Sequence, residues 1–174
     1  IVGVSPFRVA MDVYLRKCGL VDEKDEQESE HLWIGRMIEP AIAEMLADRT
    51  GMNVEKAEPL LHASEPNLGA RLDYIADGRF NVECKFLTTF GRGNWPEDAD
   101  EVPQSIVAQT TYQIGIARTA GLYLEKSLVP RLLNGVSFRI YEVAFDEELY
   151  ALLEAAAKRF WRDHVVPRVP PPLD

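Results

Sequence analysis

The chain has 174 residues, of which 47% are hydrophobic and 27% are charged, and this composition is typical of one globular domain. Its formal net charge of −9 lacks the basic excess that is common in nucleic-acid-binding proteins, although a basic groove can lie on an acidic protein. No apolar run approaches the roughly 18 residues of a membrane-spanning helix, and two cysteines with three histidines cannot supply a cysteine-rich zinc site or a four-cysteine iron–sulfur cluster.

These counts also favour one cellular setting and one class of metal. The chain shows no basic-then-apolar leader, so we expect a reduced, cytoplasmic protein without membrane attachment. Any bound metal would be held mainly by oxygen atoms, which favours Mg²⁺ or Mn²⁺.

Two helices are predicted in the first third of the chain. Ser5-Pro6 begins the first, because Ser caps helix N-termini and Pro suits the first helical position, and Gly19 ends it. Apolar residues recur at helical spacing over residues 29–50, and Gly51 ends this second helix. Pro40 lies inside the second pattern and is expected to kink the helix or divide it into two.

Strands are predicted next. Residues 52–63 indicate one short strand with loops, and residues 71–76 and 80–87 indicate two strands joined at Asp77-Gly78, a good hairpin turn. Residues 88–102 are expected to form a loop.

The C-terminal half contains helices around a second hairpin, whose turn is Asn134-Gly135. The predicted elements are a helix over 103–120, strands over 122–133 and 136–145, a helix over 146–163 and an extended proline-rich tail over 165–174. The order of elements predicts one α/β (α+β) domain over residues 1–174, with a central mixed β-sheet and helices on both faces.

The residues that suggest chemistry lie in the first hairpin. Asp73 is followed by Glu83 and Lys85, and strand alternation places Glu83 and Lys85 on one face. Two acids and a lysine at one end of a sheet suit a hard cation with an anionic substrate, and the Cys84 carbonyl could add an oxygen ligand. Charged residues on a strand more often form its solvated face, but Val82 and Phe86 beside them indicate partial burial.

The register of this hairpin decides whether the two acids meet. A two-residue loop at Asp77-Gly78 would turn Asp73 away from Glu83, whereas a three-residue loop over 77–79 pairs the two acids on one face. We therefore predict the longer loop or a bulge. Glu39 could supply a third carboxylate if its helix packs on the sheet, although an exposed helical Glu is the ordinary alternative.

Several short motifs, in order, resemble one family. They are Gly3-Val4-Ser5-Pro6-Phe7-Arg8, Gly35-Arg36-Met37-Ile38-Glu39-Pro40, Ala70-Arg71-Leu72-Asp73, Val82-Glu83-Cys84-Lys85, Val102-Pro103 through Gln109, Phe138-Arg139-Ile140-Tyr141-Glu142-Val143, and the closing Pro170-Pro171-Pro172-Leu173-Asp174. The chain resembles the YqaJ-type phage recombination exonucleases, which are relatives of lambda exonuclease in the PD-(D/E)xK nuclease superfamily. Leu72-Asp73-Tyr74 departs from the usual Pro-Asp-Gly, and Asp77 is an alternative second acid.

The resemblance implies a restriction-endonuclease-like core and a Mg²⁺-dependent (or Mn²⁺-dependent) 5′–3′ exonuclease that acts on double-stranded DNA ends and leaves 3′ overhangs. It implies that Glu39, Asp73 and Glu83 hold one or two ions and that Lys85 positions the attacking water. Gln109 would orient the water or a phosphate. Candidates for binding DNA phosphate are Ser5, Arg8 and Arg36.

Partners and alternatives follow from the same resemblance. A ring-shaped homo-oligomer and a single-strand annealing protein are expected as partners, in a bacterial or phage-infected cytoplasm. A structure-specific or nicking endonuclease on the same core is one alternative, and a catalytically inactive module that binds DNA ends is another.

Overall fold

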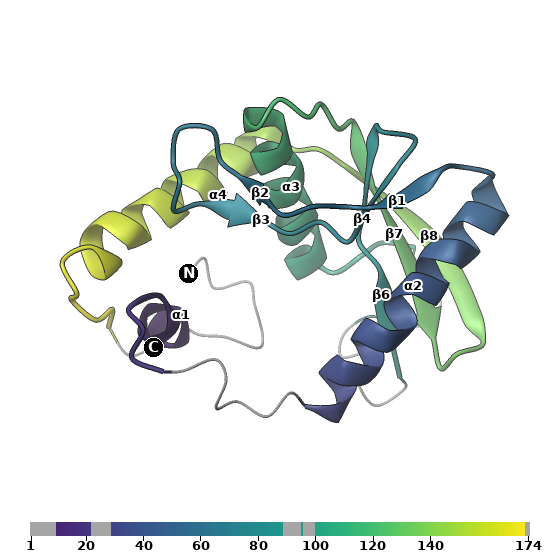
Figure 1. Cartoon of the computed structure of the whole chain (residues 1–174), viewed down its shortest axis with the longest axis horizontal. Helices are drawn as coiled ribbons and strands as arrows, with labels where there is room; N and C mark the ends of the chain where they lie inside the picture. Colours follow the sequence, from purple (N-terminus) through teal and green to yellow (C-terminus); the bar gives the residue numbers. More distant parts are fainter. Residues whose placement is uncertain (1–9, 22–28, 89–94, 96–99, 173–174) are drawn as a thin grey trace.

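The structure is a computed structural model, and it describes residues 10–21, 29–88, 95 and 100–172. One mixed sheet forms its centre (Figure 1). The strands of this sheet are β1 (Val54–Lys56), β4 (Tyr74–Ala76), β5 (Phe80–Val82), β6 (Lys85–Leu87), β7 (Lys126–Leu133) and β8 (Ser137–Ala144). β7 is central, because β5 and β6 pair with it in parallel while β8 pairs with it antiparallel. The expected fold class is therefore confirmed.

The remaining elements surround this sheet. The helices are α1 (Ala10–Lys17), α2 (Glu30–Thr50), α3 (Gln104–Thr119) and α4 (Glu147–Phe160), which continues into the π-helix η1 (Trp161–Val165); a separate two-stranded sheet is formed by β2 (Leu60–Leu61) and β3 (Gly69–Ala70). None of the helices in the described part of the chain is both long and apolar enough to cross a bilayer.

The helices α2 and α3 cover opposite faces of the sheet. On β7, Leu128 packs in a cluster with Leu46 of α2, whereas the next residue, Val129, packs in a cluster with Ile106 of α3. Because successive strand residues point to opposite faces, the odd-numbered residues of β5 and β7 face α3.

The α2 helix begins and ends as its sequence predicts. Ser29 caps the N-terminus by accepting a hydrogen bond from the Leu32 N–H, and Gly51 adopts a left-handed φ of 73° at the other end. Pro40 was predicted to kink the helix or to divide it into two; the helix continues through Pro40, so the division does not occur. The predicted start of the first helix at Ser5 lies outside the described residues, whereas Gly19, with a φ of 66°, follows its end.

The helix α4 packs closely on α3. A Cβ atom added to Gly115 of α3 would overlap the Tyr150 ring of α4, so only glycine permits this approach. At the far end of α4, Tyr14 of α1 packs with Phe160 and Val165, and α1 lies beside the C-terminal segment (Figure 1).

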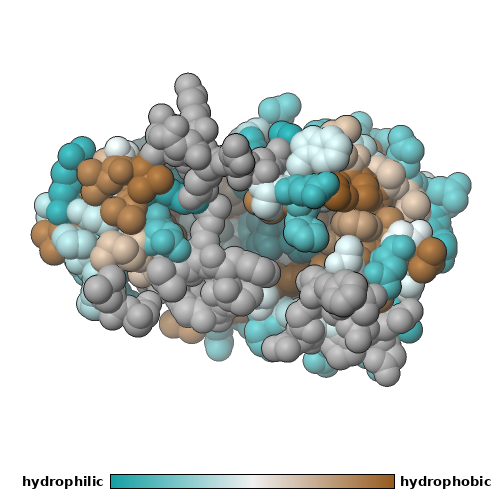
Figure 2. Space-filling model, turned by 90° about the horizontal axis from the view of Figure 1, so that it is seen from below, coloured by the Kyte–Doolittle hydropathy of each residue, from teal (hydrophilic) through white to brown (hydrophobic). Residues whose placement is uncertain are grey.

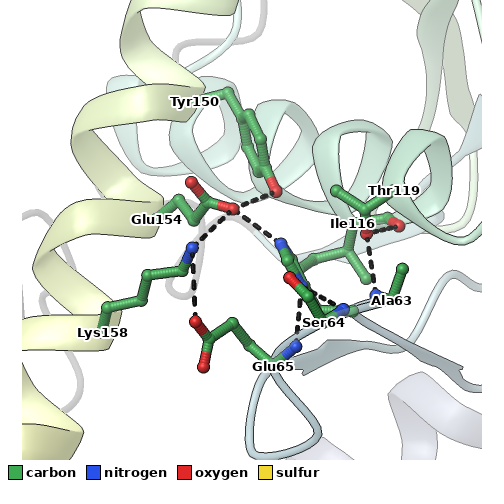
Figure 3. A network of polar contacts seen from close by, with 9 residues as sticks. Ala63, Ser64, Glu65, Ile116, Thr119, Tyr150, Glu154 and Lys158 are labelled. Carbon is green, nitrogen blue, oxygen red and sulfur yellow. Dashed lines mark hydrogen bonds and ion pairs between the residues drawn. The ribbon is translucent and has the colours of Figure 1, made fainter.

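A buried histidine, His62, ties the loop between β2 and β3 to α4. Figure 3 shows the surrounding polar network and labels Ser64, Glu65, Glu154 and Lys158. The His62 Nδ1 accepts hydrogen bonds from the backbone N–H groups of Ser64 and Glu65, so its Nε2 carries the proton and donates to Glu154 at 2.7 Å. Tyr150 and Lys158 also contact the Glu154 carboxylate.

On the surface, apolar side chains gather in separate areas with polar side chains around them (Figure 2).

Candidate active site

The site lies where the strand predicted over 80–87 is interrupted. The structure divides this segment into β5 and β6, with Glu83 and Cys84 between them. Both strands keep one register on β7, because Val82 pairs with Leu128 and Lys85 pairs with Arg131. The prediction of one continuous strand is therefore wrong.

Pro130 explains this interruption. The Leu128 carbonyl accepts a hydrogen bond from the Glu83 N–H, so it faces β5 and β6. Two residues later on the same strand, the backbone nitrogen of Pro130 faces the same side, and proline has no N–H to donate. The backbone hydrogen bonds between β7 and the β5–β6 segment are consequently interrupted beside Glu83 and Cys84.

The Glu83 carboxylate is buried, with 4% of the residue exposed, and three side chains donate to it. Its Oε1 contacts the Lys85 Nζ at 2.6 Å and accepts from the Gln109 Nε2 at 2.7 Å, while its Oε2 accepts from the Gln113 Nε2 at 2.7 Å. The Lys85 Nζ also lies 3.3 Å from the Gln109 Oε1. Burying a carboxylate is costly unless it is paired and hydrogen-bonded, and these donors satisfy that requirement.

Asp73 lies at the same strand break. Its Oδ2 accepts a hydrogen bond from the Cys84 N–H at 2.8 Å. Burial, followed by the negative charges of Glu83 and Glu39, raises the pKa of Asp73 from 3.8 to about 7. Burial also raises the pKa of the Cys84 thiol, so this thiol stays neutral. Asp77, the alternative acid, instead accepts from the Asn53 N–H in the turn between β4 and β5.

Glu39 approaches from the opposite face, on α2. Its carboxylate forms an ion pair with Lys56 of β1, a contact that the sequence analysis did not identify. Lys56 also lies 4.4 Å from the centre of the Tyr74 ring. Burial lowers the pKa of Lys56, but its hydrogen bond with Glu39 and the charge of Glu39 outweigh this and raise it.

Of the candidate phosphate-binding residues, Arg36 lies within the described part of the chain. Arg36 is exposed on α2, one turn before Glu39. Ser5 and Arg8 lie outside the described residues.

Comparison with known proteins agrees with the expected resemblance. Residues 1–120 match the family described as the YqaJ-like viral recombinase domain. The chain belongs to this family. The protein YqaJ of Bacillus subtilis (strain 168) is 27% identical over 176 residues, and the match includes 100% of this chain but 53% of YqaJ. The chain therefore spans about half the length of that relative.

Solved structures share the fold of this YqaJ-like domain. An alkaline exonuclease (LHK-Exo) from Laribacter hongkongensis superposes with a TM-score of 0.73 at 14% identity, over 95% of this chain and 84% of the exonuclease. LHK-Exo in complex with dAMP gives a TM-score of 0.75 at 14% identity, over 95% and 85% of the two chains. The protein SSO0001 is more distant, with a TM-score of 0.54 at 13% identity over 80% and 64%.

The oxygen donors of this YqaJ-like domain suit a hard divalent cation. Carboxylates and a backbone carbonyl are the ligands that Mg²⁺ and Mn²⁺ prefer. Burial is the main cause of the raised pKa of Asp73, and the charges of Glu83 and Glu39, which a cation would offset, raise it further. In the described part of the chain, no three acidic, histidine or cysteine residues form a ready-made metal cluster. Glu39 is instead paired with Lys56, and Glu83 with Lys85.

A second polar layer, to which no role was assigned from the sequence, lies behind Glu83. It consists of Gln113, Asn81 and Ser127, which are buried and joined by hydrogen bonds. The available signal was the spacing of Gln109 and Gln113, since residues four apart lie on one face of a helix.

Proposed function

We propose that the YqaJ-like domain is a metal-dependent deoxyribonuclease that digests double-stranded DNA ends in the 5′–3′ direction and leaves 3′ overhangs. The observation that carries this proposal is the convergence of Lys85 and Gln109 on the Glu83 carboxylate, beside Asp73. Membership of a viral recombinase family supports DNA as the substrate, and the fold shared with an alkaline exonuclease supports hydrolysis at DNA ends.

The acidic residues would hold the metal. Asp73, Glu83, Glu39 and the Cys84 carbonyl are the proposed ligands of one or two Mg²⁺ or Mn²⁺ ions. A divalent ion bound there would lower the pKa of water and offset charge on the phosphate. The chain itself would bring the ligands together at the break between β5 and β6.

Lys85 would position the attacking water and offset negative charge on the reacting phosphate. Its ammonium is anchored by the Glu83 Oε1 at 2.6 Å, and the Gln109 Oε1 lies 3.3 Å away. The amide of Gln109 contacts both residues, so it would keep Lys85 aligned while orienting the water or a DNA phosphate. Oriented donors of this kind are most effective in a site that excludes water.

DNA phosphates would be bound at the α2 side of the site. Arg36 is exposed one turn before Glu39, and its forked guanidinium suits a phosphate group. Ser5 and Arg8 are proposed to contribute further phosphate contacts.

We also propose a ring-shaped homo-oligomer that works with a single-strand annealing protein in the cytoplasm. The proposal rests on the family resemblance, and a ring would accommodate the net charge of −9, because acids could face outward while basic groups line the DNA path. Light scattering of the purified chain tests this proposal, and a monomer at micromolar concentration would contradict it.

A labelled-duplex assay tests the activity. Linear duplex DNA carrying a label at the 5′ or the 3′ end should release the 5′ label early and retain the 3′ label, and EDTA should stop release. Cleavage of a covalently closed circle would instead favour the endonuclease. Binding of duplex ends without any cleavage in Mg²⁺ or Mn²⁺ would identify an inactive end-binding module.

A further inference from the structure

A row of buried polar side chains runs behind Glu83 across three elements. Asn81 on β5 and Ser127 on β7 are fully buried, and they are directly paired in the sheet. The Asn81 Nδ2 donates to the Ser127 Oγ and to the Gln113 Oε1, each at 2.9 Å. Gln113 then donates from Nε2 to the Glu83 Oε2 at 2.7 Å and to the Arg71 carbonyl at 3.0 Å.

The hydrogen-bonding requirements of these groups fix the orientation of the two side-chain amides, Gln113 and Asn81. A carboxylate and a backbone carbonyl can only accept hydrogen bonds, so Gln113 must turn its NH₂ group toward Glu83 and Arg71. Its carbonyl oxygen consequently faces Asn81 and requires a donor there. Asn81 meets this requirement only by presenting its own NH₂ group.

If these polar side chains served only to stabilise the fold, they would do so at an unfavourable free-energy cost. The Asn81 Oδ1 is buried and has no hydrogen-bond partner among the described residues. An unsatisfied buried polar atom costs about 1–3 kcal/mol, whereas apolar side chains of similar shape at Asn81 and Gln113 would avoid that loss. Within the described residues, the charged group that the row reaches is Glu83.

We propose that Gln113 and Asn81 are positioning residues that fix the Glu83 carboxylate as a metal ligand. This inference rests on the proposed metal-dependent nuclease function. Lys85 and Gln109 hold one carboxylate oxygen and Gln113 holds the other, so the plane of the carboxylate is fixed from two sides. Asn81 acts one step further away, because it prevents the Gln113 amide from turning its oxygen toward Glu83.

Binding of Mn²⁺ without DNA, measured by titration calorimetry, tests the inference separately from catalysis. Gln113→Met keeps the side-chain length but removes the donor, and it should weaken Mn²⁺ binding about 10-fold or more, as loss of a group that orients a metal ligand typically does. Asn81→Leu should weaken binding by a smaller factor. Nuclease activity should recover in both variants as Mn²⁺ approaches saturation, which separates metal affinity from kcat.

Thr111→Val is the matched control, because Thr111 is buried on α3 and its hydroxyl has no partner among the described residues. It should bind Mn²⁺ as the wild type does. Gln113→Asn retains a buried amide that is too short to reach Glu83, so it provides the same test if Gln113→Met does not fold. We expect the same direction of change in Mn²⁺ affinity.

Two results would overturn the inference in distinguishable ways. Wild-type Mn²⁺ affinity in folded Gln113 and Asn81 variants, with only a lower melting temperature, would show that the row is structural. Failure of the wild-type domain itself to bind Mn²⁺ or cleave DNA would overturn the proposed function, and the inference with it.

Discussion

The Asp73 carboxylate accepts a hydrogen bond from the backbone N–H of Cys84 at 2.8 Å. The hairpin between β4 and β5 makes this contact possible, because Ala76 pairs with Phe80 around a three-residue loop. The predicted longer loop is thus confirmed. With a two-residue loop, Asp73 would face α2 instead of the face that carries Glu83.

Asp73→Asn should stabilise the metal-free domain at neutral pH while abolishing cleavage. The pKa of Asp73 is about 7 in the folded chain against 3.8 ordinarily, so ionisation opposes folding. The resulting loss in the free energy of unfolding is absent below pH 4, grows as the pH rises to about 7 and reaches on the order of 4 kcal/mol at most. In EDTA, the wild type should therefore lose more stability than Asp73→Asn between pH 5 and pH 8, with most of this loss complete by about pH 7.

Addition of Mn²⁺ provides the control for this prediction. A bound cation would offset the charges of Asp73 and Glu83, so the wild type should regain stability at pH 8 and the variant should gain less. Equal melting curves of the two proteins in EDTA at both pH values would contradict the prediction.

Lys85→Ala should eliminate catalysis without weakening metal binding. We expect the cleavage rate to fall about 10²–10⁴-fold, the usual contribution of a positioned group that acts on the attacking nucleophile. Mn²⁺ affinity should be unchanged or higher, because the variant lacks the ammonium that competes with a cation for the Glu83 Oε1, although Gln109 still donates to this oxygen. Single-turnover cleavage at saturating Mn²⁺ measures the first effect, and calorimetry measures the second.

Lys126→Ala is a suitable comparison for this variant. Lys126 is a partly exposed lysine on β7 that pairs with Glu142, outside the proposed site. Its removal should change the cleavage rate little. A Lys85→Ala protein that cleaves DNA at the wild-type rate would exclude the proposed role of Lys85.

Local chemistry made several features predictable from the sequence. Strand alternation placed Glu83 and Lys85 together, and both contact Gln109 in the structure. The cap at Ser29 and the left-handed residue at Gly51 likewise depend on neighbouring residues alone.

Features that depend on residues distant in the chain were not predictable. The break at Glu83 follows from Pro130 on the neighbouring strand, and strand pairing between them cannot be read from either segment. The pairing of Glu39 with Lys56 depends on how α2 packs on β1. Pro40 was expected to be able to divide α2, but the apolar face of this helix packs on the sheet, and tertiary packing outweighs the local preference.

Gly115→Ala should destabilise the domain by separating α3 from α4. The added methyl group overlaps the Tyr150 ring, and overpacking of this kind typically costs about 1–3 kcal/mol. Tyr150→Leu should provide room, so the same substitution should be less damaging in that background. A double-mutant cycle measured by urea unfolding quantifies the coupling, and additive effects would show that the two residues do not meet.

Lys56→Met should tighten Mn²⁺ binding in the absence of DNA. Lys56 pairs with Glu39, and it also places a positive charge near Asp73, so it would compete with a cation for the same carboxylates. The ion pair is partly exposed, so its loss should change stability by about 1 kcal/mol or less. Calorimetry should show a few-fold higher Mn²⁺ affinity for Lys56→Met and a lower affinity for Glu39→Gln. A Glu39→Gln protein with wild-type Mn²⁺ affinity would remove Glu39 from the proposed ligands, and the metal would then depend on Asp73, Glu83 and the Cys84 carbonyl.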